Sequence, residues 1–68
     1  MSVSIIVNGE PKTIEAGQTV WAFLEALELN PKKVAVERNL EIVSKSLFND
    51  VLLEDGDQLE IVHFIGGG

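Results

Sequence analysis

The sequence predicts a small α+β domain, in which one main helix lies across one face of a mixed sheet of four to five strands. Short runs of alternating apolar residues indicate strands, and one stretch with helical apolar spacing interrupts them. The 68 residues, 46 % hydrophobic and 24 % charged, suffice for one core only. The expected order is a hairpin, a helix and three further strands, and a helix in that position covers one face of the sheet.

The first two strands are predicted at residues 2–7 and 10–15. Between them stands Asn8-Gly9, a pair that favours the positive φ angles of a type I′ turn. Pro11 has no N–H to give to a ladder, so the second strand is expected at a sheet edge.

The helix is predicted over residues 20–29. Thr19 is a suitable N-cap, and the apolar residues inside the segment recur at helical spacing. The Asn30-Pro31 pair is expected to stop the helix, because a residue before proline avoids helical backbone angles. Trp21 is expected to pack along the border between helix and sheet.

The second half of the chain is predicted to hold short elements. They are strands at 34–37 and 41–43, one helical turn at 46–50 with Leu47 and Phe48 pointing inward, an extended stretch at 51–53, a tight turn at 54–57 and a last strand at 58–65. Glu54, Asp55 and Asp57 lack the spacing of a calcium loop and are expected to form a solvated turn. His63 is expected at the rim of the core side, in a structural role.

The composition excludes several classes of function. A net charge of −6 disfavours binding to nucleic acid and to anionic membranes. With no cysteine and one histidine, the chain offers no thiol nucleophile and no usual zinc site, so no metal is expected. A core this small leaves little volume for a substrate pocket, which makes a self-sufficient enzyme improbable. The longest early apolar run, Ile5–Val7, is too short for a signal peptide, so the cytoplasm is the expected compartment.

The last three residues, Gly66, Gly67 and Gly68, form a tail without side chains that follows a folded domain predicted over residues 1–65. Its one reactive group is the terminal carboxylate, ionised at neutral pH and a poor electrophile until something activates it. A frayed terminus is the alternative interpretation. If the tail is functional, missing side chains let it pass through a narrow passage and leave the acyl carbon open to attack.

Several segments, in order and spacing, resemble the ThiS family of sulfur carriers, which have the ubiquitin-like β-grasp fold. They are Asn8-Gly9, Ala16-Gly17-Gln18-Thr19-Val20, Val34-Ala35-Val36-Glu37-Arg38-Asn39, Glu41-Ile42-Val43, Asp55-Gly56-Asp57, and Glu60 to Gly68. The resemblance spans nearly the whole chain. It departs from the plainest pattern in having three terminal glycines rather than two.

The resemblance implies a role as a protein cosubstrate rather than an enzyme. In such carriers the terminal glycine, here Gly68, is adenylated by an adenylyltransferase related to ubiquitin-activating enzymes, and that partner uses the ATP. A sulfur donor protein then supplies the sulfur of a thiocarboxylate, and thiazole synthase accepts it to form the thiazole of thiamine. No cofactor bound to the chain itself is expected.

A docking patch for these partners is predicted at Ile6, Val62 and Phe64. Alternation along the last strand turns Leu59 and Ile61 toward the helix, and Val62 and Phe64 to the other face. In a β-grasp sheet the first and last strands are neighbours, which brings Ile6 to the same face. Contiguous exposed apolar residues often mark a partner site, although scattered ones are normal.

Two other functions remain open at this point. The same tail chemistry serves MoaD-like carriers in molybdopterin synthesis, and a ubiquitin-like domain can be a non-covalent adaptor. A carrier needs a free carboxylate on Gly68, whereas an adaptor tolerates extension beyond it.

Overall fold

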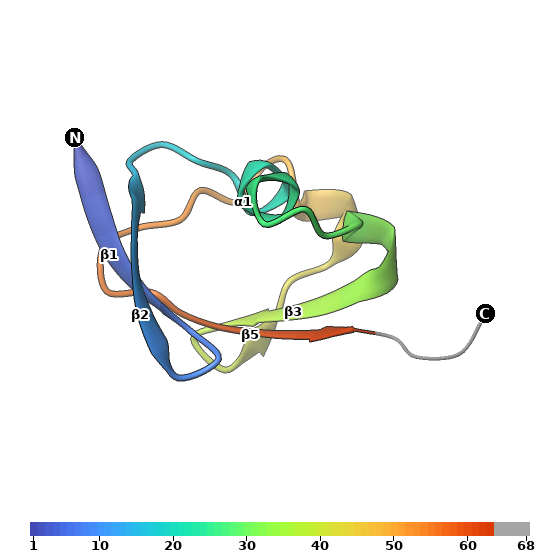
Figure 1. Ribbon diagram of the computed structural model, residues 1–68. Coiled ribbons are helices and arrows are strands. Elements are labelled where there is room, and N and C mark those ends of the chain that lie inside the picture. Colours follow the sequence, from blue (N-terminus) through green and yellow to red (C-terminus); the bar gives the residue numbers. More distant parts are fainter. Residues whose placement is uncertain (64–68) are drawn as a thin grey trace.

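The computed structural model describes residues 1–63, and the predicted end of the last strand at 64–65 and the glycine tail at 66–68 lie outside them. Residues 1–63 form five strands and one α-helix, with two short 3-10 turns (Figure 1). In chain order the elements are β1 (Ser2–Val7), β2 (Glu10–Glu15), α1 (Val20–Ala26), η1 (Pro31–Lys33), β3 (Val34–Arg38), β4 (Glu41–Ile42), η2 (Lys45–Leu47) and β5 (Gln58–His63).

The strands form one mixed sheet, as predicted, and their order is β2-β1-β5-β3-β4. Among the strand pairs of the described residues, β1–β5 is parallel, with Val7 opposite Leu59, and the other three are antiparallel. The sheet curves under α1, which covers one of its faces (Figure 1). The last strand therefore lies at the centre of the sheet, between β1 and β3.

The first hairpin has the predicted geometry. Asn8 and Gly9 both have positive φ, 49° and 85°, and β2 pairs only with β1, so it is an edge strand. Thr19 caps α1, because its hydroxyl accepts a hydrogen bond of 3.0 Å from the N–H of Ala22.

The end of α1 differs from the prediction. The helix stops at Ala26, not Leu29, and Pro31 lies in the following 3-10 turn. The N–H groups of Glu28 and Leu29 donate to the carbonyls of Glu25 and Leu24, at 2.9 and 3.0 Å. This is the Schellman pattern, in which the residue after the cap has positive φ and is usually glycine. Glu28 occupies that position with φ 62°, so this turn ends the helix before Asn30-Pro31 is reached.

Replacement of Glu28 by glycine is expected to raise the free energy of unfolding by about 0.5–1 kcal/mol. The left-handed conformation costs a residue with a Cβ roughly 1–2 kcal/mol, and glycine avoids this cost. The greater freedom of glycine in the unfolded chain offsets part of the gain in stability. Urea denaturation measures the difference. Glu25→Gly, inside the helix and also exposed, is the matched control and is expected to lose about 1 kcal/mol; equal losses in both variants would contradict the argument.

The core lies between α1 and the inner face of the sheet. Its buried residues are Ile5, Val7, Val20, Phe23, Leu24, Val34, Val36, Phe48, Leu53 and Leu59. Phe48 points inward as predicted and is fully buried. Leu47, however, is 46 % exposed, because the 3-10 turn at residues 45–47 directs inward only the residue that follows it, Phe48. Trp21 packs against this core as predicted. His63 is exposed and lies opposite the buried Val34, on the core side of the sheet, which agrees with its predicted place at the rim of the core.

Candidate functional site

The strand that leads to the tail is held on both sides. β3 pairs with β5 along its whole length, from Arg38 opposite Leu59 to Val34 opposite His63. β1 pairs with it only as far as Leu59. Leu59 is buried, Ile61 is partly buried and Val62 is exposed, which confirms the predicted alternation. The outer face of β5 therefore carries Gln58, Glu60 and Val62.

The predicted docking residues are only partly brought together. Ile6 is 38 % and Val62 58 % exposed, and both lie on the outer face. Ile6, however, lies opposite Gln58, four residues before Val62. At about 3.3 Å per residue the two side chains stand roughly 13 Å apart along the strand. Phe64 and the predicted site residues Gly66, Gly67 and Gly68 lie outside the described residues.

Between Ile6 and Val62 the outer face is acidic. Glu60 of β5 lies directly opposite Glu37 of β3, and like charges in that relation repel each other. Among residues 1–63 no basic group lies within 4 Å of either carboxylate. A partner protein that covers this part of the sheet therefore binds more favourably if it places a lysine or arginine side chain opposite the two carboxylates.

A buried carboxylate, Asp57, fixes the start of β5. Its oxygens accept hydrogen bonds from Arg38 Nε (2.8 Å), the backbone N–H of Glu54 (2.8 Å) and Asn39 Nδ2 (3.2 Å). The residue is 5 % exposed, so the expectation of a solvated turn was wrong for Asp57. We call Arg38, Asn39, Glu54 and Asp57 the Asp57 network. It joins the β3–β4 turn to the turn at 54–57.

The network shifts the acid–base equilibrium of Asp57. Burial disfavours its charged form, but the hydrogen bonds from Arg38, Glu54 and Asn39 favour it more strongly, and the net effect lowers the pKa below its ordinary value of 3.8. Asp57 is therefore ionised at neutral pH and has a structural role.

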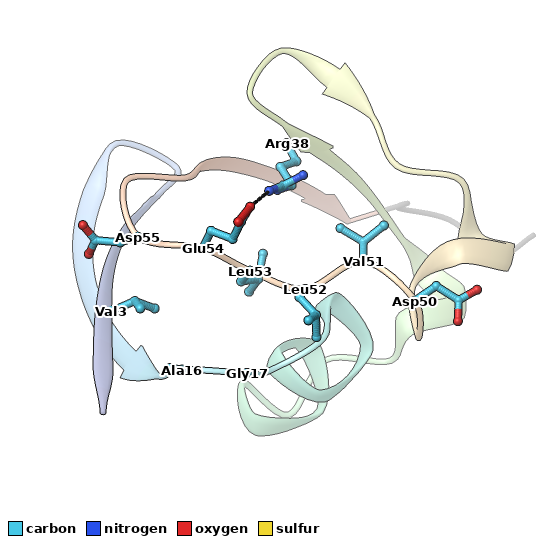
Figure 2. A pocket seen from close by; sticks show the side chains of 10 residues that line it. All are labelled: Val3, Ala16, Gly17, Arg38, Asp50, Val51, Leu52, Leu53, Glu54 and Asp55. Atoms are coloured by element: carbon cyan, nitrogen blue, oxygen red, sulfur yellow. Dashed lines mark hydrogen bonds and ion pairs between the residues drawn. The ribbon is translucent and has the colours of Figure 1, made fainter.

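A groove of about 610 Å³ opens beside this network (Figure 2). Its walls are largely apolar. The charged residues that line it are Asp50, Asp55 and the ion pair between Arg38 Nη2 and Glu54 Oε1, 3.3 Å apart. The lining residues are Val3, Ala16, Gly17, Arg38, Asp50, Val51, Leu52, Leu53, Glu54 and Asp55. The sequence analysis assigned no site residue to it. The groove flanks the start of β5, whereas the tail follows the other end of that strand.

Within residues 1–63 no three histidine or acidic side chains are placed to hold a metal ion. No helix in this part of the chain is long and apolar enough to cross a membrane. In the described part of the molecule the central strand of the sheet, β5, is the element that precedes the glycine tail in the sequence.

The sequence and fold both match one family. A model of the ThiS family matches residues 5–68. The chain belongs to the ThiS family. It is 48 % identical over 50 residues to the sulfur carrier protein ThiS of Bacillus subtilis, a match that covers 74 % of this chain and 76 % of that protein.

Structural comparison gives the same result. The crystal structure of the thiamine biosynthesis protein ThiS from Geobacter metallireducens superimposes with a TM-score of 0.80, at 34 % identity, over 97 % of this chain and all of that one. The ubiquitin-like β-grasp fold implied by the sequence resemblance is therefore confirmed.

A longer relative is also similar. A thiazole synthase of Paramagnetospirillum magneticum is 53 % identical over 66 residues, which are 97 % of this chain but 20 % of that enzyme. This ThiS-family chain thus spans about a fifth of that relative's length.

Proposed function

We propose that this ThiS-family chain is a sulfur carrier protein for thiazole formation in thiamine biosynthesis, active in the cytoplasm as a cosubstrate of other enzymes. The observation that carries the proposal is the family match, which extends through the terminal glycines to Gly68. Relatives of similar length, such as the Bacillus subtilis protein, are sulfur carrier proteins by name.

The proposed chemistry takes place at the carboxylate of Gly68. A carboxylate oxygen attacks the α-phosphorus of ATP on a separate adenylyltransferase, pyrophosphate leaves, and an acyl-adenylate forms. The terminal sulfur of a persulfide on the donor protein then displaces AMP and forms an acyl disulfide. A thiol attacks the donor's sulfur in that S–S bond, so that the thiocarboxylate leaves and a disulfide remains on the donor. Because Gly66, Gly67 and Gly68 have no side chains, the acyl carbon is open to that attack.

Mass spectrometry tests this chemistry. The chain is incubated with ATP, the adenylyltransferase of the same organism and a sulfur donor, and one oxygen of Gly68 is expected to be replaced by sulfur. Oxidation of Met1 gives almost the same mass change, so the change must be assigned to the C-terminal peptide. Unchanged Gly68 in a reaction that consumes no ATP would contradict the proposal.

Thiazole synthase is the proposed acceptor of the sulfur. Support comes from the Paramagnetospirillum enzyme, in which a stretch 53 % identical to this chain belongs to a larger protein named thiazole synthase. Domains that occur in one chain in one organism often work together as separate chains in another. The expected result is transfer from the thiocarboxylate to thiazole synthase and not to the acceptor of a molybdopterin pathway.

The outer face of β5 is the proposed docking surface for these partners, through Ile6, Val62 and Phe64. Val62 is exposed, belongs to the central strand and lies close to the start of the tail. The neighbouring acidic pair, Glu37 and Glu60, favours a partner surface with a basic group.

Val62→Asp and Phe64→Asp are each expected to weaken binding to the adenylyltransferase about tenfold or more, because a buried apolar contact is replaced by a desolvated charge. Titration calorimetry measures the affinity, and circular dichroism checks the fold. Thr13→Asp is the matched control: Thr13 is exposed on the outer face, but on the edge strand β2. An equal loss of affinity in all three variants would point to net charge, not to the surface.

A further inference from the structure

Two asparagines hold β5, one from each neighbouring hairpin. Asn8 lies in the β1–β2 turn with φ 49°, and Asn39 lies in the β3–β4 turn with φ 52°. Both occupy the left-handed region, which among residues with a Cβ asparagine tolerates best. Glycine meets that backbone requirement equally well, so the turn alone does not explain why asparagine stands at these positions.

The amide of Asn8 continues the sheet where β1 stops. The backbone N–H of Asn8 donates to the carbonyl of Leu59 (2.9 Å), which is the end of the β1–β5 ladder. Its side chain then reaches the next position: Oδ1 accepts from the N–H of Ile61 (2.8 Å), and Nδ2 donates to the carbonyl of Ile61 (3.2 Å). The carboxamide presents its oxygen and one of its two N–H groups side by side, as the C=O and N–H of a single strand residue do, so it replaces the missing strand residue.

Asn39 makes a related contact at the opposite end of β5. Its backbone N–H donates to the carbonyl of Gln58 (2.8 Å), and its Oδ1 accepts from the N–H of Gln58 (3.0 Å). Gln58 is the first residue of β5, whereas Ile61 is near its last described residue, His63. The two asparagines thus differ in one respect that matters for function, which is their distance from the tail.

We propose that Asn8 is a positioning residue for the C-terminal tail, an inference that rests on the proposed carrier function. Within residues 1–63 no residue of β1 pairs with β5 beyond Leu59, and on that side Ile61 bonds to Asn8, while β3 pairs with Val62 and His63 on the other. Asn8 holds the β1 side of β5 at Ile61, seven residues before Gly68, and this stretch spans at most about 25 Å. The strand that carries the tail is then already held in place when a partner binds, so less free energy is lost in ordering it.

The Asn8→Gly variant separates this role from the turn. Glycine keeps the positive φ of the turn and removes both side-chain hydrogen bonds to Ile61. Amide hydrogen exchange of Ile61 is expected to accelerate about tenfold or more relative to that of Ile5, which lies in the same sheet. In adenylation assays KM for the carrier is expected to rise about three- to tenfold, with kcat unchanged within about twofold. Asn8→Asp keeps the acceptor but not the donor and is expected to fall between wild type and Asn8→Gly.

Asn39→Gly is the matched control, with the same substitution in the same type of turn. It is expected to lower stability, since Asn39 belongs to the Asp57 network, and to leave KM unchanged at temperatures where it is fully folded. Equal KM changes in both glycine variants, or an unchanged KM in Asn8→Gly despite faster exchange at Ile61, would overturn the assignment of Asn8. Failure of the wild-type chain to be adenylated would instead overturn the proposed carrier function, and the role of Asn8 with it.

Discussion

A chain extended beyond Gly68 by a short tag of bulky residues is expected to lose sulfur transfer to background level. The extension converts the carboxylate of Gly68 into a peptide amide, which cannot attack ATP. The carboxylate at the new end belongs to a residue whose side chain shields the acyl carbon that the glycines leave open. The loss follows from covalent chemistry, so the fold and its stability are expected to stay unchanged. ATP-dependent pyrophosphate release by the adenylyltransferase, and thiocarboxylate by mass spectrometry, measure it.

The same tag at the N-terminus is the control. Met1 is fully exposed, and its carbonyl, which accepts a hydrogen bond of 2.8 Å from the N–H of Ala16, is retained in a tagged chain. N-terminal tagging is therefore expected to leave transfer unchanged. A C-terminally tagged chain that still forms complexes and supports thiazole formation would instead identify a non-covalent adaptor.

The sequence predicted those parts of the fold that depend on local chemistry. The Asn8-Gly9 turn, the cap at Thr19 and the alternation of Leu59 and Val62 follow from residues close together in the chain. The end of α1 was misplaced because the position that normally holds glycine holds Glu28, which gives no such signal. Proline was then the next visible stop, and it lies several residues too late.

The side-chain contacts that hold β5, made by Asp57 and Asn8, could not be predicted for a different reason. Asp57 lies 19 residues from Arg38, and Asn8 lies 53 residues from Ile61. In the sequence Asp57 stands in a run of acidic residues and a glycine that is typical of an exposed turn, and Asn8 already has a role in its own hairpin. Their contacts appear only when the sheet order brings β5 between β1 and β3. Long-range polar contacts of this kind have no local pattern.

The Asp57→Asn variant is expected to lose about 2–3 kcal/mol of unfolding free energy at pH 7, or roughly 10–20 °C in Tm for a domain of this size. The exchange leaves the Arg38 guanidinium facing a neutral amide. The new NH2 group points either toward the N–H groups of Arg38 and Glu54, which share one oxygen of Asp57, or toward Nδ2 of Asn39, and all of these are donors themselves. Arg38 is 27 % exposed in its side chain, so water recovers part of the loss, and the expected value lies below that of a fully buried pair. Thermal and urea denaturation measure it. Asp50→Asn, at an exposed residue a few positions earlier, removes the same charge and is expected to change little.

The pH dependence of stability distinguishes the contribution of the charge of Asp57 from that of its packing and hydrogen-bond geometry. The folded state lowers the pKa of Asp57 below 3.8, so the unfolded chain binds the proton more readily. The stabilisation by ionised Asp57 is therefore fully present above about pH 4 and is lost as the pH falls through the lower pKa of the folded state. Wild type therefore loses free energy of unfolding in acid through Asp57, and Asp57→Asn does not. The difference in unfolding free energy between the two proteins is expected to shrink below about pH 4. A difference that stays constant from pH 7 to strong acid would mean that Asp57 acts through packing and hydrogen-bond geometry, and not through the charge that Arg38 neutralises.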